Sequence, residues 1–163
     1  MSMSVAIVGA GNILMRDEGI GVRVIEELRR RTLPEGIRLF DAGTSIMDLI
    51  PDLAAFGRVI IVDAVKGGSP AGTMYRFRPD ELGRSVTDGG AMSLHQVSLL
   101  DSLAMEHLVS GRTLNITIVG VEPGLIELGL ELSPALAEKV SCIADLVLKE
   151  ALEGPEGPEE DRE

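Results

Sequence analysis

Short apolar runs alternate along this chain with segments in which apolar residues recur at helical spacing. Residues 5–8 are all apolar and the run stops at Gly9, which is typical of a short strand buried on both faces of a sheet. Between residues 21 and 28, apolar side chains recur every three or four positions and charged side chains take the other positions, which predicts an amphipathic helix. The chain is therefore expected to begin with a strand that leads into a helix.

The rest of the chain repeats that order. β-Branched runs and turn signals predict strands over residues 36–41, 58–63, 73–79 and 113–122, and helix starts are expected at Ser45, Ser93 and Ser133-Pro134. Strands that alternate with helices form a mainly parallel sheet with helices on both faces. We therefore expect an α/β fold.

Composition favours a single domain with an unstructured tail. The chain has 163 residues, of which 45% are hydrophobic, and this is enough apolar material for one two-faced core. We assign residues 1–152 to this domain. Residues 153–163 are mainly Glu, Pro and Gly and cannot bury enough apolar surface to offset the entropy of ordering. They are predicted to form a disordered acidic tail without a function.

Charge and cysteine content narrow the class of protein. A net charge of -11 with 2% aromatic residues argues against nucleic-acid binding, which needs clustered Lys and Arg and aromatic rings for stacking. The single cysteine, Cys142, excludes an intrachain disulfide, fits a reducing compartment and is predicted to be a small buried side chain of the last helix. Because the chain shows no signal peptide and no apolar run of the ~20 residues that cross a bilayer, we expect a cytoplasmic protein without membrane insertion.

Polar residues follow several predicted strands at their carboxyl ends. Residues 9–18, residues 41–44, Asp63 and Glu122 each come after a strand. Parallel strands of one sheet have their carboxyl ends at the same edge, and sites in such sheets form there. We therefore expect these segments to share one edge.

The first of these segments looks superficially like a dinucleotide-binding turn. It has a Gly-x-Gly at residues 9–11, but Leu14 occupies the position of the third glycine and no Gly-Lys-Ser/Thr phosphate loop is present. Asp17 and Glu18 would also place negative charge beside a pyrophosphate. A nucleotide site is therefore disfavoured, and Asp17 is interpreted as a loop or first-turn carboxylate that the helix dipole stabilises.

A metal site fits the same edge better. Glu18, Asp63 and His95 lie on three separate segments, and two carboxylates with one imidazole are suitable ligands for a divalent transition ion. The stretch SLHQ is typical of a capping box with Ser93 as N-cap and Gln96 as N3, which places His95 in the first turn of a helix. There the positive helix end keeps the imidazole neutral. A solvent-exposed residue at a helix start explains His95 equally well, and the pattern alone does not decide between the two.

Other polar residues are given structural roles. His107 lies on the apolar stripe of a helical segment with Leu100 and Leu103, which favours a partly buried structural histidine over a ligand. Ser45 is interpreted as a helix cap, because no Gly-x-Ser-x-Gly elbow surrounds it, and Asp48 belongs to the same cap.

Together these motifs resemble one family, the hydrogenase maturation endopeptidases, which trim the C-terminus of the large subunit of nickel-iron hydrogenases. The resemblance rests on GNILMRDEGIGVRVIEEL, DAGT, VIIVDAV, GTM followed by a polar loop and SLHQ, and VGVEP, and it covers nearly the whole chain except the tail. It implies a three-layer α/β/α sandwich around a mixed, mostly parallel central sheet. It also implies that the family's metal-contacting residues fall on Glu18, Asp63 and His95.

The family usually has an Asp-Gly-Gly-Thr type of segment after the second strand, which here is Asp41-Ala42-Gly43-Thr44. The resemblance implies substrate contacts at Gly43 and Thr44, although Ala42 removes some backbone freedom. Asp41 is the candidate catalytic residue that orients water or substrate. Its alternative role is to accept backbone hydrogen bonds in the turn.

The implied function is removal of the C-terminal extension from a nickel-loaded large-subunit precursor. In this family the metal is thought to be nickel that the precursor already carries, so Glu18, Asp63 and His95 would complete its coordination. Other divalent ions are expected to enter the same site in vitro. From the residues alone two alternatives stay open: a non-catalytic nickel-binding chaperone or checkpoint protein, and a nucleotide-binding α/β domain.

Overall fold

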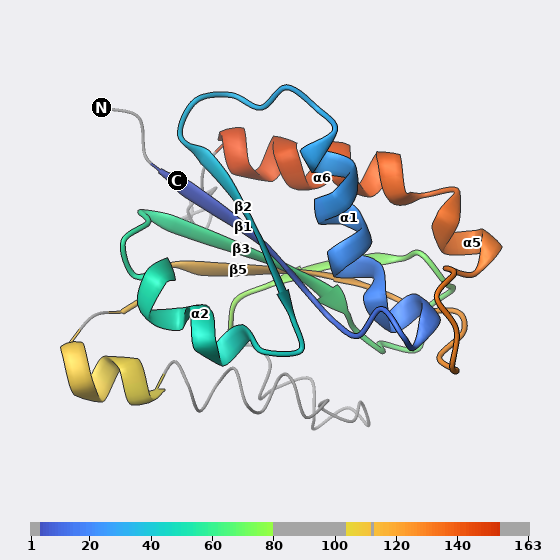
Figure 1. The fold of residues 1–163 in the computed structure, drawn as a ribbon, viewed down its shortest axis with the longest axis horizontal. Coiled ribbons are helices and arrows are strands. Elements are labelled where there is room, and N and C mark those ends of the chain that lie inside the picture. Colours follow the sequence, from blue (N-terminus) through green and yellow to red (C-terminus); the bar gives the residue numbers. More distant parts are fainter. Residues whose placement is uncertain (1–3, 80–103, 112, 154–163) are drawn as a thin grey trace, which may run out of the picture.

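One mixed sheet of five strands organises the molecule (Figure 1). A computed structural model describes residues 4–79, 104–111 and 113–153. The strands are β1 (Val5–Ala10), β2 (Ile37–Gly43), β3 (Arg58–Ala64), β4 (Met74–Phe77) and β5 (Ile116–Val121). The helices are η1 (Arg16–Gly19), α1 (Ile20–Arg29), α2 (Ile46–Leu53), α5 (Pro134–Ala137) and α6 (Val140–Glu153), and residues 104–110 form a further helical segment.

The sheet topology confirms the predicted α/β fold. The strand order is β2-β1-β3-β5-β4, in which β1 pairs in parallel with β2 and β3, and β3 pairs in parallel with β5. The edge strand β4 runs antiparallel to β5, so the sheet is mixed but mostly parallel. Helices α1 and α6 lie on one face of the sheet and α2 lies on the other (Figure 1).

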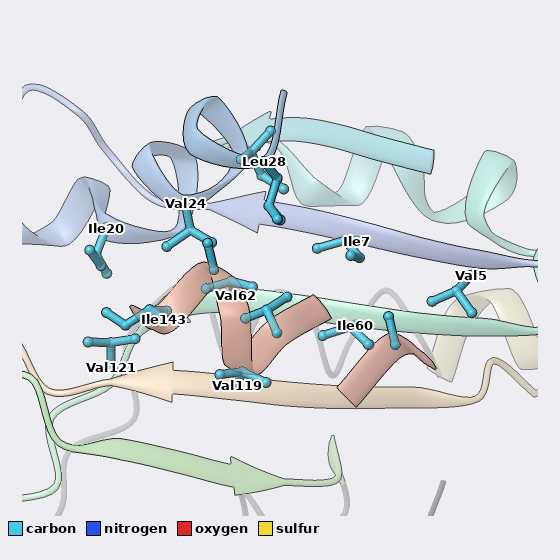
Figure 2. Packing of buried hydrophobic residues seen from close by; sticks show 14 of the residues in the cluster. Val5, Ile7, Ile20, Val24, Leu28, Ile60, Val62, Val119, Val121 and Ile143 are labelled. Atoms are coloured by element: carbon cyan, nitrogen blue, oxygen red, sulfur yellow. The ribbon is translucent and has the colours of Figure 1, made fainter. Parts of the chain in front are cut away.

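The apolar run of the first strand is explained by this layering. Val5 and Ile7 pack into the cluster that α1 and α6 cover (Figure 2), whereas Ala6 and Val8 pack into the cluster under α2. A strand covered on both faces needs apolar side chains at every position rather than at alternate ones. The prediction of a doubly buried first strand is confirmed.

Glycines allow α1 to approach the sheet closely. A Cβ atom on Gly21 would lie 2.1 Å from the carbonyl oxygen of Val62 and 2.5 Å from that of Ala10, and one on Gly9 would lie 2.4 Å from the carbonyl oxygen of Gly21. The close helix-to-strand contact that a dinucleotide fold makes with its third glycine is therefore made here by Gly21. The opening stretch thus shares the close helix packing of a nucleotide-binding turn, even though Leu14 stands where the third glycine would be.

Two burial predictions were wrong, both for residues placed by helical periodicity. Cys142 is exposed on α6, because the neighbouring Ile143 and Ala144 take the buried face of that helix. His107 is also exposed, and Leu108 on the same helical segment is 79% exposed. An apolar stripe indicates which face of a helix can be buried, but it does not guarantee that another element covers that face.

The last predicted helix differs in the structure, and two other predicted segments lie outside the described residues. The last helix is divided in two, since α5 ends at Ala137 and α6 begins at Val140, and α6 reaches Glu153. The SLHQ stretch with His95 and the rest of the predicted tail, residues 154–163, lie outside the described residues. Within the residues that are described, none of the helices has the length and apolar character needed to span a membrane.

Candidate functional site

The sheet brings three of the candidate residues to one edge. In the register of the sheet, β1 residue Gly9 pairs with Asp41 of β2 and with Val62 of β3, so Asp41 and Asp63 lie at nearly the same level. Glu18 lies in η1, in the connection that leaves the end of β1. The predicted edge at the carboxyl ends of the strands is therefore confirmed for these three residues.

Gly11 is the point at which the segments of this edge meet. Its N–H donates to the carbonyl oxygen of Gly43 at 2.8 Å, which ties the end of β1 to the end of β2. A Cβ atom on Gly11, whose φ is +135°, would lie 2.0 Å from the carbonyl oxygen of Glu18 and 3.6 Å from Oδ1 of Asp63. Those two oxygens are thus no farther apart than the two distances together. Only glycine permits this approach.

Asp63 is a buried carboxyl group with little stabilisation of its charged form. It is 7% exposed, and its Oδ1 accepts a hydrogen bond from the N–H of Ala64 at 2.8 Å. Burial raises the pKa of Asp63 to about 8, the Ala64 N–H offsets this only in part, and the charge of Glu18 raises the pKa further. At neutral pH without a cation, Asp63 therefore holds a proton.

This pair of acids has the character of a cation site. A divalent ion beside Glu18 and Asp63 would offset the cost of burying the ionised Asp63 and the repulsion between the two carboxylates. Within the described ranges, no cluster of three or more metal-ligating side chains is present. The structure thus brings together Glu18 and Asp63, and the third predicted ligand, His95, lies outside what it describes.

Asp41 and its neighbours form a tight turn at the exposed edge. Oδ1 of Asp41 accepts a hydrogen bond from the N–H of Gly43 at 2.9 Å, and Gly43 has a φ of +51°. Asp41 and Thr44 are exposed, whereas Ala42 is buried and packs under α2. The turn therefore shows the backbone-accepting role considered for Asp41. The orienting role of Asp41 and the substrate contacts of Gly43 and Thr44 stay predictions.

Glu122 organises the neighbouring loop. Its buried carboxylate accepts hydrogen bonds from the N–H groups of Gly67 and Gly68, both at 2.7 Å. Its own N–H donates to the carbonyl oxygen of Thr73 at 2.8 Å. This explains the acid of the VGVEP motif, since Glu122 holds the connection between β3 and β4 against the end of β5.

Asp17 has a role that the sequence did not reveal. It lies in the first turn of η1, as predicted, but its carboxylate is fully buried and accepts hydrogen bonds from the backbone N–H groups of Gly124, Leu125 and Ser133 and from the Ser133 hydroxyl. Burial alone would raise the pKa of Asp17, but the hydrogen bonds from Ser133, Leu125 and Gly124 outweigh it and lower the pKa. These partners are 107 to 116 positions away in the sequence, so no local signal could have found them.

Comparison with known proteins identifies the family. The family model described as hydrogenase maturation protease matches residues 22–150 of this chain. The hydrogenase 2 maturation protease of Escherichia coli is 35% identical over 149 residues, covering 90% of this chain and 89% of that protein. The hydrogenase expression/formation protein HupM of Azotobacter chroococcum is 34% identical, covering 88% of this chain and 73% of that protein.

A solved structure agrees with this relationship. The hydrogenase maturating endopeptidase HybD from Escherichia coli superposes with a TM-score of 0.81 at 34% sequence identity, and the match covers 93% of each chain. The shared fold and the sequence matches extend over almost the whole of the described domain. This chain belongs to the hydrogenase maturation protease family.

Proposed function

We propose that this protease removes the C-terminal extension from the nickel-loaded precursor of a nickel-iron hydrogenase large subunit. The observation that carries the proposal is the buried carboxyl group of Asp63 near Glu18. Burial raises the pKa of Asp63 to about 8, and a cation would stabilise its ionised form. Membership of the family supports the proteolytic activity. It does not favour the non-catalytic chaperone or the nucleotide-binding alternative.

The metal in this proposal belongs to the substrate. Glu18, Asp63 and His95 would complete the coordination of the nickel that the precursor carries, and carboxylate and imidazole groups suit a divalent transition ion. Three protein ligands leave positions for groups of the precursor. Bound nickel would supply Lewis-acid polarisation of the scissile carbonyl or of a water molecule.

The chain's own residues have distinct parts in this proposal. A cation beside Asp63 would favour release of its proton to solvent, and Glu18 would join the same coordination from η1. Asp41, whose carboxylate is held by the Gly43 N–H at the exposed edge, orients water or the peptide. Gly43 and Thr44 contact the extended peptide beside it. We place this reaction in the cytoplasm, where a reducing environment suits a chain with a single cysteine.

Single substitutions of the proposed ligands test the site. Glu18→Ala, Asp63→Ala and His95→Ala should each reduce processing of a nickel-loaded precursor by about 100-fold or more, because each removes a ligand. The mass of the large subunit reports cleavage, circular dichroism reports folding, and Asp52→Ala on the exposed face of α2 is the matched control. Normal processing by His95→Ala would contradict the ligand set, and an intact precursor mass with the wild-type protein would contradict the proteolysis itself.

A further inference from the structure

The residue before Glu18 has a buried carboxylate that accepts four hydrogen bonds. Asp17 is 0% exposed, and its Oδ1 accepts from the Ser133 N–H at 2.7 Å. Its Oδ2 accepts from the N–H groups of Gly124 and Leu125, each at 2.8 Å, and from the Ser133 hydroxyl at 2.6 Å. A charged acceptor with this many donors forms some of the strongest hydrogen bonds available to a protein.

Backbone contacts join the same two segments. The N–H of Asp17 donates to the carbonyl oxygen of Leu125 at 3.1 Å, and the N–H of Arg16 donates to that of Gly129 at 3.0 Å. The N–H of Gly129 donates back to the carbonyl oxygen of Leu14 at 2.9 Å. The connection that carries Glu18 is therefore fastened along its length to residues 124–133.

The fastened connection also holds a strained residue. Arg16 has a φ of +48°, a left-handed conformation that costs a residue with a side chain about 1 kcal/mol or more. Its side chain is held by the carbonyl oxygen of Glu131 at 3.0 Å and by the carboxylate of Glu127 at 2.8 Å. Such a conformation persists only where the surroundings determine it, and Arg16 is the first residue of η1.

These hydrogen bonds fix the location of Glu18. On one side, the Glu18 carbonyl oxygen lies against Gly11, close to the Asp63 carboxylate. On the other side, the following Gly19 packs so tightly that a Cβ there would lie 2.8 Å from the Cα of Ile13. The charge of Glu18 acts on Asp63, whereas the Asp17 carboxylate is hydrogen-bonded to residues 124–133.

We infer that Asp17 is a positioning residue, which anchors η1 to residues 124–133 and thereby holds the Glu18 carboxylate beside Asp63 before any cation arrives. This inference rests on the proposed function only in taking Glu18 as a ligand. It requires an acceptor-only side chain at position 17, because three of its four partners are backbone N–H donors. An asparagine would turn its NH2 group toward at least one of those donors.

A double-mutant cycle on Ni²⁺ affinity separates positioning from general loosening of the fold. Ni²⁺ alone is titrated into the full-length wild-type chain, Asp17→Asn, Glu18→Ala and the double variant. If Asp17 acts through Glu18, Asp17→Asn should lower the affinity about 10-fold or more in the wild-type background and less than about two-fold once Glu18 is alanine. Asp52→Asn, at an exposed position of α2, should leave the affinity unchanged.

Each result of this titration supports or overturns the positioning role of Asp17. An affinity that falls equally in both backgrounds, or that does not change in folded Asp17→Asn, overturns the positioning role. Ser133→Ala removes only the 2.6 Å hydroxyl bond and keeps the backbone donors, so it takes the place of Asp17→Asn if that variant does not fold. It should weaken Ni²⁺ binding about two- to five-fold, and an unchanged affinity would then overturn the inference. If Glu18→Ala itself binds Ni²⁺ like the wild type, the proposed ligand set fails instead.

Discussion

Asp17 and Asp63 are two buried aspartates at the same end of the molecule with opposite electrostatic states. Asp17 accepts four hydrogen bonds, and its pKa is lowered. Asp63 accepts one hydrogen bond, from Ala64, among the residues described, and burial raises its pKa to about 8. Burial is therefore not what distinguishes them. The number of donors supplied to each carboxylate decides which of them is ionised in the folded chain.

The difference separates a structural acid from a candidate ligand. A carboxylate whose donors all come from the protein has no free capacity for a ligand, and it stabilises the fold in its charged form. A buried carboxyl group with few donors costs stability when ionised, and it gains most from a cation that arrives later. Asp17 fits the first description and Asp63 fits the second.

The largest expected effect on stability is that of Asp17→Asn. The substitution removes the charge and leaves at least one backbone N–H without an acceptor, so we expect a loss of about 3 kcal/mol in the free energy of unfolding at pH 7. Urea unfolding measures it, with Asp52→Asn as the control. Because the lowered pKa of Asp17 contributes stability above its ordinary value of 3.8, the wild type should also lose this advantage as the pH falls below that value. An Asp17→Asn variant as stable as the wild type would remove the contrast between the two aspartates.

Asp63→Asn should have the opposite sign. Between the ordinary pKa of 3.8 and about 8, the folded chain holds a proton on Asp63 that the unfolded chain has released, so stability from this group falls as the pH rises. Asparagine has no such proton to lose. In metal-free protein at pH 8, the variant should therefore be more stable than the wild type, by on the order of 2 kcal/mol, while its precursor processing is lost.

The pH dependence is the check on this second prediction. The stability difference between Asp63→Asn and the wild type, measured by urea unfolding in the presence of a chelator, should grow from pH 5 to about pH 8 and then level off. A difference that stays constant over that range would contradict a raised pKa at Asp63. Added Ni²⁺ should narrow the gap, because it stabilises only the chain that keeps the ligand.

Removal of the acidic tail should have the smallest effect. Apart from proline, residues 154–163 contain no aliphatic or aromatic side chain that could add to a core, so a chain that ends at Glu153 should keep its melting temperature within about 1 °C and its processing rate within about two-fold. Differential scanning calorimetry and the precursor mass assay measure both. A loss of several degrees would show that the tail docks on the domain.

Much of the fold and part of the site could be predicted from sequence because the relevant signals are local. The doubly buried first strand, the amphipathic α1 and the additional strand over residues 73–79 follow from runs of a few residues. The antiparallel pairing of β4 at the edge of the sheet does not. Glu18 and Asp63 could be assigned to one edge because parallel strands end together. The alternation of strands and helices predicted a sheet covered on both faces, and ligand chemistry gave the candidate set Glu18, Asp63 and His95. The resemblance to the family implied the same three residues and the three-layer sandwich.

The remainder depends on contacts that no local pattern records. The hydrogen-bond partners of Asp17 lie more than a hundred positions later in the sequence. From the sequence Asp17 therefore looked like an ordinary first-turn acid, and its burial was not predicted. The burial predictions for Cys142 and His107 were wrong for a related reason, since periodicity shows which face of a helix is apolar but not which elements pack against it. The sequence shows two adjacent acids, Asp17 and Glu18, but it does not show that they have different roles.

We propose that the nickel ion arrives bound to the substrate precursor and is held in part by Glu18 and Asp63. The direct measurement mixes chelator-treated protein with nickel-loaded and with nickel-free precursor and follows the mass of the large subunit. Because two carboxylates and one imidazole hold a divalent ion only weakly, the metal-stripped protein should still cleave the nickel-loaded precursor, while the nickel-free precursor should resist even with added Zn²⁺. Equal cleavage of both precursors, or cleavage only after the protein is loaded with Zn²⁺, would contradict the account.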